Sequence, residues 1–157
     1  MGVFFTLQAS RNALRYCIVR RQFSSQQGTK EERKVIDYQP TSFTLAKLIA
    51  RGYTMAIAGI WSNKEFLRMM TDIKNKNFSR MDSMHHILSG FKVTFSAQAL
   101  NDVEESRRCC GGAGYQSNSG FTTLYSAVSP IPTYEGENTV MLGQASRYLI
   151  KLIKKSE

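Results

Sequence analysis

Residues that break helices are scarce in this sequence. Only three prolines (Pro40, Pro130 and Pro132) occur among 157 residues, so long stretches are free to form helices. No segment alternates apolar and polar residues with period two, so we expect no strands. The sequence therefore favours a chain built from helices and loops.

Cysteine and histidine are also scarce, which argues against two common kinds of scaffold. The three cysteines (Cys17, Cys109 and Cys110) form no CxxC pair, and an odd count makes a poor disulfide framework. We expect free, mostly structural thiols in a reducing compartment. The only histidines, His85 and His86, are adjacent and diverge by about 100° on a helix, so we expect no metal site.

Long apolar runs are absent, so we expect no membrane-spanning segment. The net charge of +9 suggests an anionic partner: nucleic acid, an acidic membrane or a phosphorylated cofactor. Charge alone does not choose among them, and a solvated basic face is the commoner explanation. No nucleic-acid motif is visible, so we expect no nucleic-acid partner.

Acidic residues are missing before Glu31, and the first 30 residues carry four arginines. This composition mimics a mitochondrial transit peptide, and Gly2 with Thr6 fits the loose myristoylation pattern. The apolar residues Leu7 and Leu14, with Cys17, recur at helical spacing, so a folded amphipathic helix explains the segment equally well.

The helical spacing of apolar residues, and the proline and glycine residues that interrupt it, predict an all-α fold, an up-and-down bundle of four long helices. The long helices are expected at residues 3–23, from 38 or 41 to 73, at 82–110 and at 137–154, with a short helix at 121–128. An exposed loop is expected at 24–34 and a turn-rich loop at 129–136. The glycines of 111–114 should end the third long helix.

Three short segments carry residue types suited to chemistry. Arg20 to Phe23 places two guanidinium groups beside an aromatic ring, which can grip phosphates, although a solvated basic helix end explains it too. Cys110 to Tyr115 contains glycines that let a cofactor approach the backbone, or that form a tight turn after a helix. Glu135 precedes the last helix, and Glu137 or Asn138 could cap that helix, which leaves Glu135 available as a general base.

These segments, in this order and spacing, resemble the acyl-CoA oxidase family of the acyl-CoA dehydrogenase superfamily. The matching stretches are Ala13-Leu14-Arg15-Tyr16 through Arg20-Arg21-Gln22-Phe23, Asp37-Tyr38-Gln39, Ser89-Gly90-Phe91-Lys92, Cys110-Gly111-Gly112-Ala113-Gly114-Tyr115 and Tyr134-Glu135-Gly136-Glu137-Asn138-Thr139-Val140-Met141. Together they cover nearly the whole chain. The run that follows Glu135 resembles the peroxisomal oxidases more than the electron-transferring dehydrogenases.

The resemblance implies an activity and a catalytic residue. Glu135 matches the family's catalytic base, which takes the α-proton of a fatty acyl-CoA while FAD takes the β-hydride. The product is a trans-2-enoyl-CoA, and O₂ receives the electrons and becomes H₂O₂. The implied process is fatty acid β-oxidation in the peroxisome.

The resemblance also implies how FAD is held. Arg20 and Phe23 match residues that contact the FAD of a neighbouring subunit, and Gln39 matches a position near the same contact. Gly112 matches a segment around the adenosine half of FAD, and Glu137 and Thr139 match positions that touch the flavin. The implied assembly is a homodimer that shares its FAD sites across the interface.

Residues 1–157 match only the C-terminal helical domain of such an enzyme; the N-terminal helical domain and the middle β-domain have no counterpart here. The last three residues, Lys155, Ser156 and Glu157, are not a peroxisomal signal. We therefore expect the chain to be inactive alone and to expose apolar helix faces. Two alternatives stay open: part of a mitochondrial acyl-CoA dehydrogenase, and a non-catalytic helical module for dimerisation or binding.

Overall fold

The computed structural model describes residues 2–24 and 31–156. The helices are α1 (Gly2–Val19), α2 (Gln39–Lys74), α3 (Met81–Cys109), α4 (Phe121–Val128) and α5 (Asn138–Ser156). Short 3₁₀ turns lie at η1 (Val35–Asp37), η2 (Gly111–Tyr115) and η3 (Ser117–Ser119). The all-α class predicted from the sequence is confirmed.

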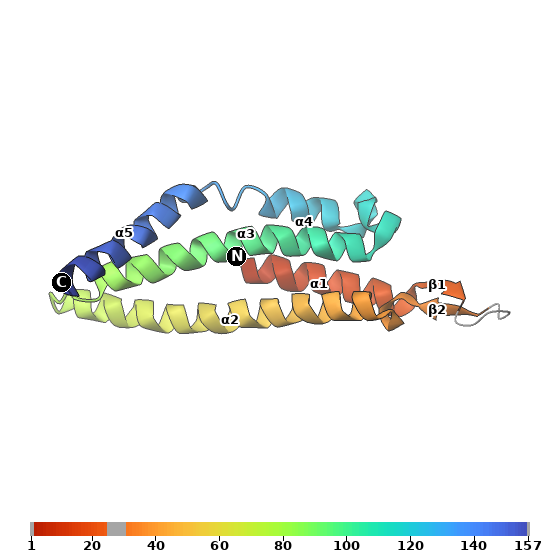
Figure 1. Cartoon of the computed structure of the whole chain (residues 1–157), viewed down its shortest axis with the longest axis horizontal. Helices are drawn as coiled ribbons and strands as arrows, with labels where there is room; N and C mark the ends of the chain where they lie inside the picture. The colour runs from red at the N-terminus through yellow and green to blue at the C-terminus, as the bar shows by residue number, and fades with distance from the viewer. Residues whose placement is uncertain (1, 25–30, 157) are drawn as a thin grey trace.

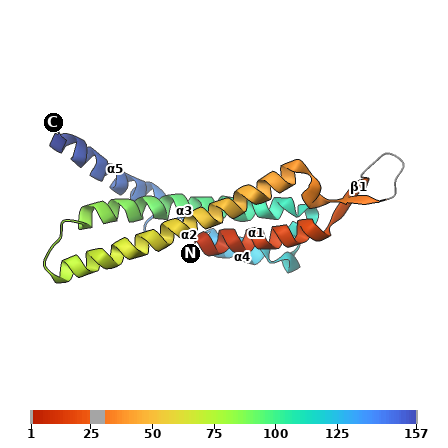
Figure 2. The ribbon, with the colours of Figure 1, turned by 90° about the horizontal axis from the view of Figure 1, so that it is seen from below.

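Helix α3 is the centre of the arrangement. Helices α2 and α3 run antiparallel along the length of the molecule, and α1 lies along one half of both (Figure 1). Helices α4 and α5 pack on α3, and α5 diverges from the other helices towards its C-terminal end (Figure 2). The loop between α4 and α5 is thereby placed over the middle of α3.

The expectation that the chain forms no strands is wrong, as is the expectation that the first helix reaches residue 23. Residues Arg21–Ser24 form strand β1, which pairs antiparallel with β2 (Glu32–Lys34), with Arg21 opposite Lys34. Phe23 has a φ of 64°, which a continuing right-handed helix excludes. The strands are too short, and too exposed on both faces, to show an alternating pattern in the sequence.

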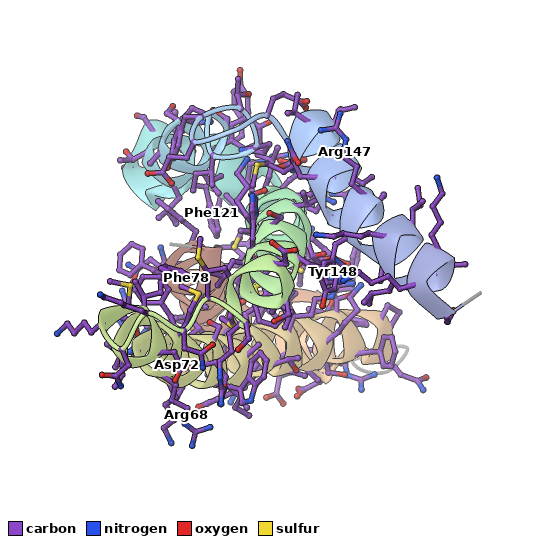
Figure 3. The ribbon with its side chains drawn as sticks, turned by 90° about the vertical axis from the view of Figure 1, so that its left-hand side faces the viewer. Arg68, Asp72, Phe78, Phe121, Arg147 and Tyr148 are labelled. Atoms are coloured by element: carbon purple, nitrogen blue, oxygen red, sulfur yellow. The ribbon has the colours of Figure 1, made fainter. Side chains whose placement is uncertain are left out.

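Small residues bring α1 close to α3. Ala9, Ala13 and Cys17 on α1 are fully buried, as are Ala99 and Val103 on α3. Phe121 of α4 points into the space beside these helices and is 2% exposed (Figure 3). Side chains as small as alanine allow helix axes to approach closely, so the core is narrow and well filled.

A buried carboxylate also joins the first three helices. Asp102 of α3 is 0% exposed and accepts hydrogen bonds from Thr6 Oγ1 at 3.1 Å and Arg51 Nη1 at 2.8 Å. Gln98 Nε2 donates to it at 2.9 Å. Because a buried charge is tolerated only when it is paired and hydrogen-bonded, this network fixes α1 and α2 against α3.

Apolar side chains are exposed along α2, as expected from the sequence. Tyr53 is 62% exposed, Ile57 67% and Ile60 61%. These residues recur at spacings of three and four and therefore form one stripe on the helix.

Gly114 allows η2 to turn back on the end of α3. A Cβ atom at Gly114 would lie 2.3 Å from the carbonyl oxygen of Arg107, so a backbone atom fills the space that a side chain needs. We expect Gly114→Ala to lower the free energy of unfolding by about 1–3 kcal/mol, measured by urea denaturation. Gly112→Ala is the matched control, because a Cβ atom there meets nothing within 4 Å. Equal stability of the two variants would contradict this packing.

Candidate active site

Glu135 lies in the loop that joins α4 to α5, in a left-handed backbone conformation. Its φ is 56°, and that of Gly136 is 99°. A positive φ raises the free energy of a non-glycine residue such as Glu135, so this conformation persists only where the surrounding structure stabilises it. A Cβ atom at Gly136 would also lie 2.6 Å from Sδ of Met141, so glycine is required there. Glu135 is exposed and lies three residues before Asn138, the first residue of α5.

Glu135 borders an apolar pocket of about 280 Å³, which we call the Glu135 pocket. The pocket lies between the start of α1, the middle of α2 and α3, and the α4–α5 loop. Its walls are mostly apolar and include Gly2, Met55, Gly59, Leu88, Phe91 and Phe95, and the polar side chains of Ser62, Lys92 and Ser96 also line it. A carboxylate at the edge of an apolar cavity can take a proton from a bound apolar substrate.

Lys92 of α3 ties the Glu135 loop to the bundle. Its Nζ donates to the carbonyl oxygen of Pro132 at 3.0 Å, to that of Gly136, and to Oδ1 of Asn138 at 2.8 Å. These acceptors lie on both sides of Glu135 in the chain. In the sequence, Lys92 belongs to a matching stretch but has no assigned role, because helical periodicity does not predict contacts between residues 40 to 46 positions apart.

Asn138, the first residue of α5, completes the attachment of the loop. Its Nδ2 donates to the carbonyl oxygen of Val93 at 3.3 Å and to Oγ of Ser96 at 3.0 Å. Ser96 is itself buried. The start of α5 is therefore fixed on α3 one turn away from Lys92.

Replacing Lys92 by methionine should loosen the Glu135 loop and leave the helices in place. Hydrogen bonds to a charged group contribute about 1.5–3 kcal/mol, so amide hydrogen exchange in residues 132–141 should speed up by about tenfold or more. Lys64→Met is the control, because Lys64 is exposed on α2. Unchanged exchange in Lys92→Met would show that Lys92 does not hold the loop.

Glu137 caps α5. Its carboxylate accepts hydrogen bonds from the backbone N–H of Thr139 at 2.7 Å and of Val140 at 3.3 Å, and from the Thr139 hydroxyl at 3.2 Å. Desolvation raises the pKa of Glu137, but these hydrogen bonds and the nearby Lys92 outweigh it and the pKa is lowered. Capping therefore accounts for Glu137 and leaves Glu135 free for another role.

Three of the residues matched to FAD contacts gather at the hairpin end of the molecule (Figure 1). Arg20 follows α1 and is exposed, and Phe23 lies in β1 with its side chain 70% exposed. Gln39 begins α2, and the neighbouring Tyr38 donates its hydroxyl to the carbonyl oxygen of Gln22 at 2.8 Å. The hairpin is thus attached to the start of α2.

The remaining matched residues divide between two places. Gly112 lies exposed in η2, at the same end of the molecule as the hairpin. Thr139 lies in the first turn of α5, next to the Glu135 loop. The chain therefore presents two separate groups: Arg20, Phe23, Gln39 and Gly112 at one end, and Glu135, Glu137 and Thr139 over the middle of α3.

Neither the thiols nor a metal offers a competing reactive centre in the described residues. Burial raises the pKa of Cys17 to about 11 and that of Cys110 to about 12, so both thiols stay protonated.

Within residues 2–24 and 31–156, His, Cys, Asp and Glu form no group able to hold a metal ion. His86 instead stacks on Tyr148 of α5 with ring centres 5.0 Å apart. None of the described helices combines the length and apolar character needed to cross a bilayer.

Comparison with known proteins finds one family model, described as "Acyl-CoA oxidase, C-alpha1 domain", which matches residues 2–150. Peroxisomal acyl-coenzyme A oxidase 1 of Rattus norvegicus is 34% identical over 140 residues, which are 89% of this chain and 21% of the rat protein. Acyl-coenzyme A oxidase acox-1.4 of Caenorhabditis elegans is 37% identical over 153 residues, 96% of this chain and 23% of the relative.

Solved structures agree with these matches. An acyl-CoA oxidase from Lycopersicon esculentum (tomato) superposes with a TM-score of 0.93 at 33% identity, covering 98% of this chain and 23% of that one. Acyl-CoA oxidase-1 of Caenorhabditis elegans, solved in complex with FAD and ATP, gives 0.91 at 35% identity, covering 96% and 22%. The chain thus spans between a fifth and a quarter of the length of these relatives.

Proposed function

Because the chain belongs to the acyl-CoA oxidase family through its C-alpha1 domain, we propose that it supplies the catalytic base and part of the FAD site of a fatty acyl-CoA oxidase. The reaction is the desaturation of a fatty acyl-CoA to a trans-2-enoyl-CoA in fatty acid β-oxidation. The observation that supports it most is the carboxylate of Glu135, held at the edge of an apolar pocket by a strained loop.

In this proposal Glu135 takes the α-proton of the acyl thioester. The Glu135 pocket holds the first part of the acyl chain and excludes water from it. Lys92 and Asn138 keep the loop at a fixed position over α3, so the carboxylate meets the α-carbon without rearrangement. The backbone N–H of Glu135 donates to the thioester oxygen and stabilises the charge that develops there.

The residues matched to FAD fit that cofactor chemically. Arg20 is an exposed cation three residues before Phe23, whose ring is also exposed, and these residue types suit a diphosphate and an aromatic ring system. The open space around Gly112 lets a cofactor reach the backbone. Held by these residues, FAD would supply the redox chemistry of the reaction, namely an acceptor for the β-hydride and a route for the electron pair to O₂, which becomes H₂O₂.

The two groups of site residues suggest a homodimer. Arg20 and Gly112 lie at the hairpin end, whereas Glu135 lies over the middle of α3, so one chain presents two partial FAD surfaces. A second copy related by a two-fold axis brings the hairpin end of one subunit to the Glu135 loop of the other.

A peroxisomal location is part of the same proposal. Relatives such as the rat protein are named peroxisomal acyl-coenzyme A oxidases. The mitochondrial alternative considered from the sequence gains no support from the comparisons, because the matched proteins are named oxidases.

A hybrid enzyme tests the proposed FAD contacts. This chain replaces the matching 140-residue segment of the rat oxidase, and retained FAD is measured by visible absorbance after gel filtration. Arg20→Met is expected to weaken FAD retention about tenfold or more, because a charge-assisted hydrogen bond is lost. Arg15→Met on the exposed face of α1 is the control. Equal FAD retention by both variants would show that Arg20 does not contact FAD. A folded hybrid that produces no acyl-CoA-dependent H₂O₂ would contradict the proposed activity.

A further inference from the structure

Met141 of α5 packs against the loop that carries Glu135. Its Sδ would lie 2.6 Å, and its Cγ 3.0 Å, from a Cβ atom at Gly136. The thioether therefore fills the space in which any other residue at position 136 would place a side chain. Because Gly136 directly follows the strained Glu135, the Met141 side chain supports the loop at the point where its backbone is left-handed.

The Met141 side chain also borders a largely apolar cavity of about 310 Å³, which we call the methionine pocket. Three further methionines line this pocket: Met69 of α2, and Met81 and Met84 of α3. Met81 is 44% exposed and Met84 is 4% exposed, so the pocket runs from the surface into the interior. The volume is ample for water-sized molecules, and hydrogen peroxide is only slightly larger than water. Peroxide can therefore reach Met141 in the folded chain.

Hydrogen peroxide converts a thioether into a sulfoxide in a two-electron step. A lone pair of Sδ attacks one oxygen of H₂O₂, an S–O bond forms and the O–O bond breaks, and the second oxygen leaves as water with both protons. The sulfur is oxidised and the peroxide is reduced. The new side chain is polar and carries one more oxygen atom. Since Sδ of Met141 already lies against Gly136, that atom is accommodated only if the side chain or the loop moves.

We propose that Met141 is an oxidation site, and that its sulfoxide displaces the Glu135 loop and slows abstraction of the α-proton. The inference rests on the proposed function for the source of the oxidant, because H₂O₂ is a product of the reaction that Glu135 serves. A displacement of a reacting group by about 1 Å can lower a rate by about 100-fold. Accumulated product therefore lowers the activity of the enzyme, and reduction of the sulfoxide restores it.

The first test uses the full chain and added H₂O₂, with peptide mass spectrometry and amide hydrogen exchange as the two measurements. The peptide that contains Met141 should gain the mass of one oxygen atom. Exchange in residues 132–138 should then speed up by about tenfold or more, because the loop loses packing on its α5 side. Methionine sulfoxide reductases of both types, one for each epimer, should reverse the mass gain and the faster exchange.

Met141→Leu is the matched variant, because leucine has a similar volume and cannot be oxidised. The same dose of peroxide still oxidises the other accessible methionines in this variant, so the difference between the two proteins isolates Met141. Exchange in the loop of Met141→Leu should be the same before and after peroxide. Met70→Leu, which removes a 39% exposed methionine of α2, should respond like the unmodified chain.

Two results would overturn the inference. One is equal acceleration of loop exchange by peroxide in the unmodified chain and in Met141→Leu. The other is a Met141 that stays reduced when the exposed Met70 and Met81 are fully oxidised.

The hybrid enzyme separates the inference from the proposed function. During turnover of palmitoyl-CoA without catalase, the unmodified hybrid should lose activity at least tenfold faster than the Met141→Leu hybrid. Catalase, which removes H₂O₂, should abolish that difference. Equal loss in both hybrids would contradict the inference and leave the proposed function standing. A hybrid that makes no H₂O₂ would contradict the proposed function, whereas the result with added peroxide would still decide whether Met141 controls the loop.

Discussion

Replacing Asp102 by alanine is expected to lower the free energy of unfolding by about 3 kcal/mol, the largest loss of stability expected from any side chain considered. The carboxylate is 0% exposed and accepts hydrogen bonds from α1, α2 and α3. Its removal leaves Thr6 and Gln98 without their acceptor in the interior. Arg51 is 32% exposed and also pairs with Glu105 at 3.1 Å, which keeps the loss near the lower end of the range for buried pairs.

Urea denaturation measures the loss of stability. A change of about 3 kcal/mol moves the midpoint by roughly 1–3 M for a chain of this size. Asp82→Ala is the matched control, because Asp82 pairs with Lys151 on the surface, with both side chains more than half exposed. Surface pairs of this kind contribute little, so its midpoint should not move measurably. Equal shifts in the two variants would show that the buried network does not hold the helices together.

Replacing Glu135 by glutamine is expected to reduce acyl-CoA-dependent H₂O₂ production by the hybrid enzyme at least 100-fold. Glutamine keeps the size of the side chain but cannot take the α-proton, and a positioned general base contributes about 10²–10⁴-fold. Stability should be unaffected, because the Glu135 side chain is exposed and the loop is held by Lys92 and Asn138.

Two comparisons make the loss of activity specific. Glu31→Gln alters an exposed carboxylate in the hairpin region and should retain full activity. FAD retention by Glu135→Gln should equal that of the unmodified hybrid, which separates loss of the base from loss of the cofactor. If Glu135→Gln keeps more than a tenth of the activity, the chain acts as a binding or dimerisation module and another residue is the base.

The helices could be predicted from the sequence because their signals are local. Apolar spacing located α2 and α3, and Pro40 with the glycines after Cys110 marked where these helices begin and end. The β1–β2 hairpin could not be predicted, since its short exposed strands lack an apolar pattern and depend on a left-handed residue, Phe23. Local signals define helices better than they define short edge strands.

In the candidate site too, the roles that depend on neighbouring residues could be predicted, and those that depend on distant contacts could not. Glu135 could be singled out because capping of α5 needs only a neighbouring residue, and Glu137 performs it in the structure. The role of Lys92 could not be predicted, because the oxygen atoms that accept its hydrogen bonds belong to residues 40 to 46 positions away in the chain. Asp102 looks like a surface acid in the sequence, and only the packing of α1 and α2 shows that it is buried.

The central claim is that this chain supplies the base for desaturation of a fatty acyl-CoA. Its most direct test is the bleaching of the visible flavin absorbance when palmitoyl-CoA is mixed with the FAD-loaded hybrid enzyme in the absence of O₂, which isolates desaturation from the later oxygen reaction. Rapid bleaching with the unmodified hybrid, slowed at least 100-fold by Glu135→Gln, is the expected result. Bleaching at the same rate in both proteins would contradict the account.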